Sequence, residues 1–330
     1  MNIRKHKQLA AVALCAALAS CGGARRGGAD GLEGELSLSG TFALYPLAVQ
    51  WAQDFEQLHP GVRVDISAGG AGKGMTDVLA GVVDLGMVSR EIYPPEADKG
   101  AVAFALAKDA VVPTISAANP LLPRLLEHGL TREAAAAVWL SDTLTTWGQL
   151  LGTADSTPLH AYTRSDACGA AETWAQWLGA RQEDLGGTAV FGDPGVAAAV
   201  QKDIYGIGLN NIGYAYDNQT LRPNDGLQVL PIDTDADGRI SDSERFYADK
   251  RLLTVAIADG RYPSPPARDL YLVSRGVPAS PVVRAFIEYV LGPGQQKNEP
   301  AGYIAMSPDR VDAALGLLGT PAASDTKTDR

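Results

Sequence analysis

An α/β fold with doubly wound, mostly parallel sheets is predicted for this chain by three features of its sequence. Short apolar runs of strand character alternate with segments whose apolar residues recur at helical spacing. Glycine-rich turns follow several of these runs and open the next helix. The chain has 330 residues, 46% of them hydrophobic, which is enough for one large or two medium domains with buried cores. Strand–helix–strand order with short turns is typical of parallel strands covered by helices.

The N-terminal elements show both periodicities. Leu47, Trp51 and Phe55 recur at helical spacing and predict one buried helical stripe. Apolar residues alternate with polar ones in residues 62–67, which predicts a strand. In chain order, the predicted elements are a strand at 35–39, a helix at 43–58, a strand at 62–67, a helix at 74–80 and a strand at 83–88.

The remainder of the chain continues this alternation. Residues 262–266, Tyr-Pro-Ser-Pro-Pro, predict a stiff connector before the last strand. The predicted strands are 102–106, 110–115, 159–163, 206–216 with a turn, 227–232 and 270–274. The predicted helices are 131–140, 146–151, 170–178, 194–201, 246–258 and 281–291.

The N-terminus predicts export and a lipid anchor. Basic residues precede an apolar core at residues 9–18 that is too short to span a bilayer. Leu18-Ala19-Ser20-Cys21 resembles a bacterial lipobox, which implies a signal peptide at 1–20, lipidation of Cys21 and an extracytoplasmic, membrane-anchored protein of the cell envelope. The alternative is an ordinary secretory signal with a chance cysteine. Residues 21–34 predict a flexible tether, and residues 320–330 a disordered tail.

Charge and cysteine content limit the possible functions. The net charge of −10 argues against a nucleic-acid partner, because binding phosphate backbones requires a basic face. Cys15 leaves with the signal peptide and Cys21 carries the lipid, so Cys168 remains alone and no intramolecular disulfide is expected.

Four turns between residues 40 and 170 predict an anion site. The N–H groups at a helix start attract anions, because they lack acceptors and lie at the positive end of the helix dipole. Several such turns with one arginine would enclose a small oxyanion. The four turns are Gly40-Thr41-Phe42, residues 69–74 (Gly-Gly-Ala-Gly-Lys-Gly), residues 86–90 (Gly-Met-Val-Ser-Arg) and residues 164–170 (Arg-Ser-Asp-Ala-Cys-Gly-Ala).

The order and spacing of these turns resemble the phosphate-binding periplasmic proteins that serve ABC importers, over residues 35–310. The resemblance implies the two-lobed (type II) periplasmic-binding-protein fold, with phosphate or a similar tetrahedral oxyanion held between the lobes. It assigns residues 35–110 and 269–319 to lobe I and residues 111–268 to lobe II, joined by a hinge of two crossing strands. It also implies a monomeric binding protein without enzymatic activity, whose partner is the membrane permease of the importer.

The resemblance also implies which residues contact the anion. Arg164 would bind it with its planar fork, oriented by Asp166. The other implied contacts are Thr41, Phe42, Ala71, Gly72, Ser89, Cys168, Gly169 and Ala170, mostly through backbone N–H groups.

Several positions depart from the family pattern. Ala71, Cys168 and Ala170 stand where the family often has hydroxyl side chains, and Ser89 where it has Asp or Ser. Arg90 and Lys73 are either additional ligand contacts or surface charges. The site of a phosphate binder accepts the proton of the bound anion and so rejects sulfate. Ser89 would discriminate less sharply than Asp, so another oxyanion or a small anionic solute remains an alternative ligand.

Residues 233–244 match the twelve-residue calcium loop of an EF-hand. Gly238 occupies the sharp turn and Ile240 the apolar eighth position. The alternative is a solvated acidic loop. The predicted Ca²⁺ ligands are Asp233, Asp235, Asp237, the Arg239 carbonyl, Ser241 through water and Glu244.

A thiol enzyme is the alternative from another functional class. Cys168 at a helix start beside Arg164 would have a lowered pKa, and His160 and Asp166 are the nearby candidate bases in the sequence.

Overall fold

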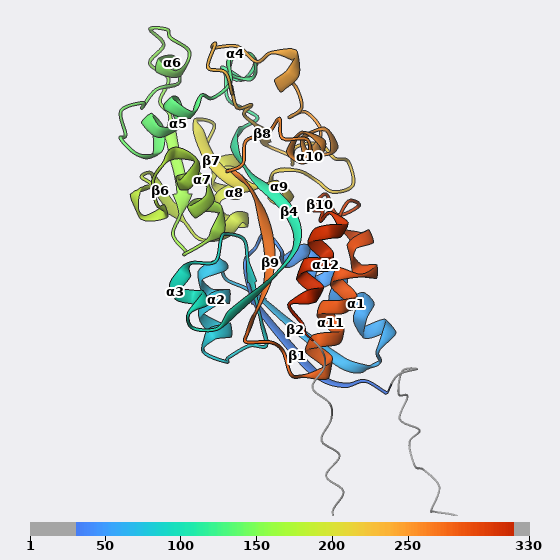
Figure 1. The fold of residues 1–330 in the computed structure, drawn as a ribbon. Helices are drawn as coiled ribbons and strands as arrows, with labels where there is room; N and C mark the ends of the chain where they lie inside the picture. The colour runs from blue at the N-terminus through green and yellow to red at the C-terminus, as the bar shows by residue number, and fades with distance from the viewer. Residues whose placement is uncertain (1–30, 320–330) are drawn as a thin grey trace, which may run out of the picture.

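The computed structural model describes residues 31–319 (Figure 1). The predicted signal peptide (1–20), the lipidated Cys21, most of the predicted tether and the tail (320–330) lie outside these residues. Within them, no helix combines the length and the apolar character needed to cross a membrane.

The strands of the described residues form one continuous ladder in the order β2-β1-β3-β9-β4-β7-β5-β6, and β8 and β10 also pair with β4. Parallel pairing joins β1 to β2 and β3 at one end, and β5 to β6 and β7 at the other. The strands are β1 (Glu33–Gly40), β2 (Gly61–Ala68), β3 (Leu85–Val88), β4 (Ala101–Ser116), β5 (His160–Arg164), β6 (Thr188–Val190), β7 (Gly206–Asn211), β8 (Leu227–Val229), β9 (Ala267–Arg275) and β10 (Ile304–Ala305).

The helices cover this ladder. The longer ones are α1 (Tyr45–Leu58), α2 (Ala71–Leu79), α4 (Leu122–His128), α5 (Arg132–Trp139), α7 (Gly169–Leu178), α8 (Gly192–Lys202), α10 (Lys250–Ala258), α11 (Pro281–Leu291) and α12 (Pro308–Gly316). The shorter turns are α3 (Pro94–Ala97), α6 (Trp147–Leu150), α9 (Ile212–Ala215), η1 (Gln182–Asp184), η2 (Asp242–Glu244) and η3 (Pro293–Lys297).

Two long antiparallel strands, β4 and β9, join the halves of the molecule (Figure 1). The first half of β4 pairs with β9, and its second half pairs with β7 and β8. The prediction of separate strands at 102–106 and 110–115 is therefore wrong. The intervening Ala107, Lys108 and Asp109 continue the ladder with β9, after a register shift between Ala105 and Ala107.

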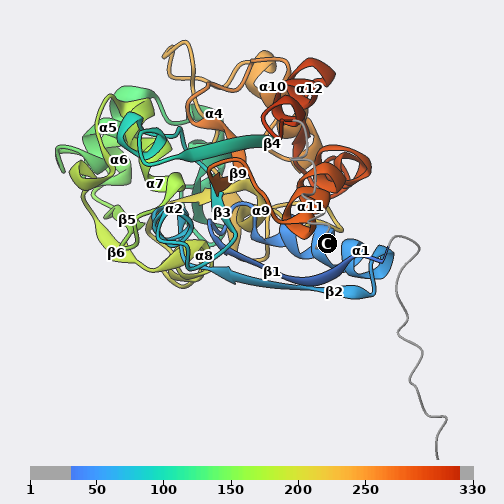
Figure 2. The ribbon, with the colours of Figure 1, turned by 60° about the horizontal axis from the view of Figure 1, so that its bottom comes forward.

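Each half has its own hydrophobic core. The core of lobe I packs β1, β3 and β9 against α1 and α11, around Trp51, Phe55 and Phe286. The core of lobe II packs β4 and β7 against α5 and α7, around Trp139 and Trp174. A smaller cluster lies between α2, β3 and β9, so helices cover both faces of the lobe I sheet (Figure 2). This arrangement confirms the predicted doubly wound α/β class.

Some element boundaries differ from the predictions. β1 begins at Glu33, inside the predicted tether. Helix α10 begins at Lys250, four residues after the predicted start, because Asp249 caps it by accepting a hydrogen bond from the Arg251 N–H. Strand β7 ends at Asn211, and the segment predicted to continue it forms α9 instead. The sequence did not predict α4, β6 or α12.

A buried ion pair links the two crossing strands. Arg268 on β9 places its Nε 3.0 Å from Oδ1 of Asp109 on β4, and both side chains are at least 95% buried. The guanidinium also bonds Asn211 of β7 and Thr173 of α7. Burial raises the pKa of Asp109, although the charge of Arg268 opposes this rise. A buried ion pair therefore links the two crossing strands, and its hydrogen bonds extend into lobe II.

We expect Asp109→Ala to lower the free energy of unfolding by about 3 to 5 kcal/mol, because it leaves the Arg268 charge buried without its partner. Denaturant unfolding would measure the loss. The matched control is Asp65→Ala, whose pair with Arg63 is exposed and should change stability by less than about 0.5 kcal/mol. Equal effects of the two changes would contradict this assignment.

Candidate functional site

The four predicted turns meet where the two halves of the molecule touch. The Gly72 N–H of α2 donates to the Ala167 carbonyl of lobe II at 3.0 Å. A Cβ at Gly70 would lie 2.8 Å from Oδ2 of Asp166, and a Cβ at Gly169 would collide with Ser89. Only glycine permits these approaches, and Gly70 also has a φ of +92°. The carboxyl ends of β1, β3 and β5 therefore meet at one place, as expected for ligand sites in such sheets.

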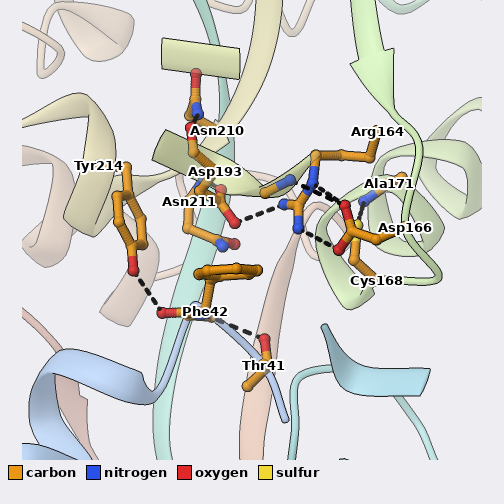
Figure 3. Close-up of polar contacts among 12 residues, drawn as sticks. Thr41, Phe42, Arg164, Asp166, Cys168, Ala171, Asp193, Asn210, Asn211 and Tyr214 are labelled. Carbon is orange, nitrogen blue, oxygen red and sulfur yellow. Dashed lines mark hydrogen bonds and ion pairs between the residues drawn. The ribbon is translucent and has the colours of Figure 1, made fainter. Parts of the chain in front are cut away.

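Arg164 ends β5 and lies at the centre of this region (Figure 3). Its side chain is 1% exposed and is bonded to two carboxylates. Asp166 accepts from Nε at 2.9 Å and from Nη2 at 2.6 Å, as predicted, and Asp193 accepts from Nη1 at 2.5 Å. Burial acts to lower the pKa of Arg164, but the negative charges of Asp193 and Asp166 outweigh it and raise the pKa above its usual range.

Asp193, in the first turn of α8, was not predicted from the sequence. Its Oδ1 accepts from the Asn211 N–H at 2.9 Å, and its carbonyl accepts from Asn210 Nδ2 at 2.9 Å (Figure 3). The one feature of the sequence that could have indicated Asp193 is the segment Gly-Asp-Pro-Gly, which lies at the start of a predicted helix. One guanidinium and two carboxylates give the cluster a formal charge of −1, so Arg164 alone does not make this region cationic.

Four backbone N–H groups beside this cluster have no acceptor among residues 31–319. They belong to Phe42, to Ala71 at the start of α2, and to Gly169 and Ala170 at the start of α7. Lobe I and lobe II contribute two each. Such groups at helix starts are the donors that bind anions in proteins.

Other predicted N–H donors are already engaged in this structure. The Gly72 N–H bonds the Ala167 carbonyl, and the Cys168 N–H bonds Oε1 of Gln182 at 2.9 Å. The Cys168 sulfur instead caps α7 by accepting from the Ala171 N–H at 3.4 Å. These two residues shape the turn rather than leave their N–H groups free.

The predicted hydroxyl contacts come together in lobe I. Oγ1 of Thr41 and Oγ of Ser89 are 2.7 Å apart, and both residues are buried. Because they end neighbouring strands, β1 and β3, this pair follows directly from the sheet order.

Phe42 makes contacts across the lobe boundary. Its ring packs against Phe191 with the centroids 6.0 Å apart, and its centroid lies 5.5 Å from the guanidinium carbon of Arg164. The Tyr214 hydroxyl of lobe II donates to the Phe42 carbonyl at 3.1 Å (Figure 3). Phe42 was predicted from the sequence as a contact of the anion, whereas no role was predicted for Phe191 or Tyr214.

Arg90 and Lys73 each pair with a carboxylate of lobe I. Arg90 is 8% exposed and makes two hydrogen bonds to the Glu96 carboxylate, at 2.7 and 2.9 Å. Its guanidinium also stacks 4.1 Å from the Tyr93 ring centroid. Lys73 pairs with Asp77 one turn along α2. Each cation is therefore held by a neighbouring carboxylate of lobe I.

The structure does not favour the alternative of an activated thiol at Cys168. Burial raises the pKa of Cys168 to about 11, and the nearby Arg164 charge only partly opposes it. The His160 side chain is half exposed, and its Nδ1 lies 2.7 Å from Asp203 Oδ2. A protonated buried thiol without a free base does not favour nucleophilic catalysis.

The acidic loop follows β8 and lies in lobe II. Carboxylate oxygens of Asp233, Asp235 and Asp237 lie within 4.8 Å of one another. Glu244 lies outside this group, and its carboxylate accepts hydrogen bonds from Thr234 and Ser241. The Arg239 N–H bonds Oδ1 of Asp237 at 2.8 Å.

Comparison with known proteins finds a matching family model and several related proteins. A family model described as a PBP superfamily domain matches residues 27–293. The phosphate-binding protein PstS of Pseudomonas aeruginosa (strain PAO1) is 25% identical over 314 residues, which cover 88% of this chain and 89% of that protein. PstS of Methanocaldococcus jannaschii is 24% identical over 331 residues, covering 84% of each chain.

Two crystal structures share the fold. A phosphate ABC transporter substrate-binding protein with bound phosphate from Clostridium perfringens matches with a TM-score of 0.67 and 19% identity, over 83% of this chain and 100% of that chain. An ABC-type phosphate transport receptor from Vibrio cholerae matches with a TM-score of 0.60 and 20% identity, over 82% and 100%. These matches confirm the predicted two-lobed fold.

We expect Cys168 to resist alkylation in the folded protein, because it is 4% exposed and its pKa is raised to about 11. Iodoacetamide at pH 8 should leave the tryptic peptide that contains Cys168 unmodified, and the same treatment in guanidinium chloride should modify it completely. Mass spectrometry would measure both. Rapid modification of the folded protein would restore the thiol alternative.

Proposed function

This chain belongs to the PBP superfamily, and we propose that it captures inorganic phosphate between its two lobes and delivers it to an ABC importer. The observation that carries the proposal is the set of N–H groups of Phe42, Ala71, Gly169 and Ala170 beside Arg164, which have no acceptor in the described part of the chain, residues 31–319. Both lobes supply these donors, so an anion bound between them ties the lobes together. The relatives named as phosphate-binding proteins support phosphate as the anion.

Arg164 provides the charged part of the cradle. Its terminal nitrogens each donate one hydrogen bond to a carboxylate, to Asp193 from Nη1 and to Asp166 from Nη2. One N–H on each nitrogen is left for two oxygens of a tetrahedral anion. The starts of α2 and α7 add the positive ends of two helix dipoles. Rotation of the lobes about β4 and β9 would open and close this cradle.

The two carboxylates give the site a means of selection. Asp166 and Asp193 each have an oxygen that accepts one hydrogen bond from Arg164 and can still accept a hydrogen bond from a protonated oxygen of a bound anion. Phosphate near neutral pH carries such a proton, whereas sulfate does not. An unprotonated sulfate oxygen facing a carboxylate is repelled. Asp193 thereby supplies the acceptor that Ser89 provides only weakly.

The proposed protein acts at the cell envelope. Lipidation of Cys21 would anchor it to a membrane, facing the periplasm or the cell surface, and residues 22–32 would let the binding domain reach the permease. We propose that it works there as a monomer, without enzymatic activity. The remaining alternative ligand is another oxyanion or a small anionic solute, which calorimetry with phosphate, sulfate, arsenate and molybdate would distinguish.

Wild-type protein should bind phosphate with submicromolar affinity in isothermal titration calorimetry, and Arg164→Lys should weaken binding about 100-fold. Lysine keeps the charge but loses the planar fork that contacts two oxygens. The matched control is Arg63→Lys, an exposed position on β2. Absence of phosphate binding by the wild type would overturn the proposed function.

Asp193→Asn should reduce the preference for phosphate over sulfate at least about 10-fold, mainly by improving sulfate binding, because it removes a charge that faces the anion. Asparagine retains an oxygen for the Asn211 N–H. The control with the same charge change is Asp98→Asn at an exposed position. An unchanged preference in a folded Asp193→Asn protein would contradict the selective role of this carboxylate.

A further inference from the structure

We propose that the loop at residues 233–244 holds one Ca²⁺ ion through Asp233, Asp235 and Asp237. The ligand-bearing oxygens of these three carboxylates lie within 4.8 Å of one another, although no two of the residues are adjacent in the chain. Oxygen donors of this kind, without sulfur or nitrogen ligands, suit a hard divalent cation.

Asp233 provides the independent indication of a ligand. The residue is 2% exposed, and its Oδ1 is buried without a hydrogen-bond partner among residues 31–319. Its other oxygen accepts from the Gly238 N–H at 2.8 Å. A buried carboxylate oxygen without a hydrogen-bond donor is costly, and a cation removes this cost.

No ion pair within residues 31–319 compensates the negative charge of the three clustered aspartates. Residues 233–244 contain five acidic side chains and one arginine. The ion pairs formed within residues 31–319 include none of the three clustered aspartates, and the single pair in this segment joins the exposed Asp242 to Arg245. Three carboxylates at this spacing repel one another unless a cation lies among them.

The surrounding sequence supports calcium in particular. The carboxylates occupy positions 1, 3 and 5 of the EF-hand loop pattern, and the Arg239 carbonyl stands at position 7. Gly238 has a φ of +79° at the position where that pattern requires glycine. The Glu244 carboxylate instead receives four hydrogen bonds from Thr234 and Ser241, so it closes the loop onto itself. We therefore assign the primary ligands to the three aspartates.

The position of the loop indicates a structural role. The Ile240 N–H donates to the Glu127 carbonyl of α4 at 2.8 Å, and the Asp233 N–H donates to the Leu130 carbonyl at 3.2 Å. Ile240 is 3% exposed beside Gly129. The ion would stabilise the packing of the segment between β8 and α10 against α4. This region is the end of lobe II that lies away from lobe I (Figure 1). The proposal is therefore independent of phosphate binding.

Calorimetry on the full chain tests this site. Protein stripped with EDTA and dialysed into phosphate-free buffer is titrated with CaCl₂ and, separately, with MgCl₂. We expect one Ca²⁺ per chain with a Kd between about 10⁻⁷ and 10⁻³ M, and weaker binding of Mg²⁺. Saturating calcium should raise Tm by at least about 3 °C, because it binds only the folded loop.

The variants separate a coordinated ion from general attraction to negative charge. Asp237→Asn should weaken calcium binding at least about 10-fold, and it changes an exposed side chain, so folding should persist. Asp242→Asn makes the same charge change in the same loop, at a fully exposed side chain outside the cluster, and should alter the affinity less than about 3-fold. Equal losses in both variants, or no calcium binding by the wild type, would overturn the proposal.

Discussion

The buried charge of Arg164 is the constraint around which the lobe boundary is organised. A guanidinium that is 1% exposed must have its hydrogen-bond donors and its charge satisfied inside the protein. Asp166 does this from the same turn, and Asp193 does it from α8. The two carboxylates exceed the charge of Arg164 by one unit, so the proposed binding of an anion would depend mainly on backbone donors. Such donors survive the loss of side-chain hydroxyls at Ala71 and Ala170.

Close backbone approach is the second condition for this arrangement. The Gly72 N–H reaches the Ala167 carbonyl across the lobe boundary, and glycine at position 169 lets α7 begin directly against Ser89. Two further contacts cross the same boundary. The Tyr214 hydroxyl donates to the Phe42 carbonyl, and Arg268 forms an ion pair with Asp109. The crossing strands and the proposed anion cradle are therefore connected through β7, whose Asn211 contacts both Arg268 and Asp193.

Much of the fold followed from local pattern. The helical stripe of Trp51 and Phe55 and the alternation in residues 62–67 predicted α1 and β2, because burial of one face imposes these periods. The continuous strand β4 was not predicted, since its polar residues Lys108 and Asp109 interrupt the apolar pattern. Asp109 is tolerated there because Arg268, 159 residues away in the chain, neutralises it. No local signal carries that information.

The sequence by itself determined the four turns, the pairing of Arg164 with Asp166 and the acidic loop, because each is encoded within a few consecutive residues. Only the tertiary structure decided that Asp193 forms an ion pair with Arg164, that Arg90 forms one with Glu96, and that burial keeps the Cys168 thiol protonated. These outcomes depend on which distant strands and helices meet, and on how completely they exclude water. Packing of the whole chain determines the contacts and the exclusion of water, and the spacing of residues along the chain predicts neither of them.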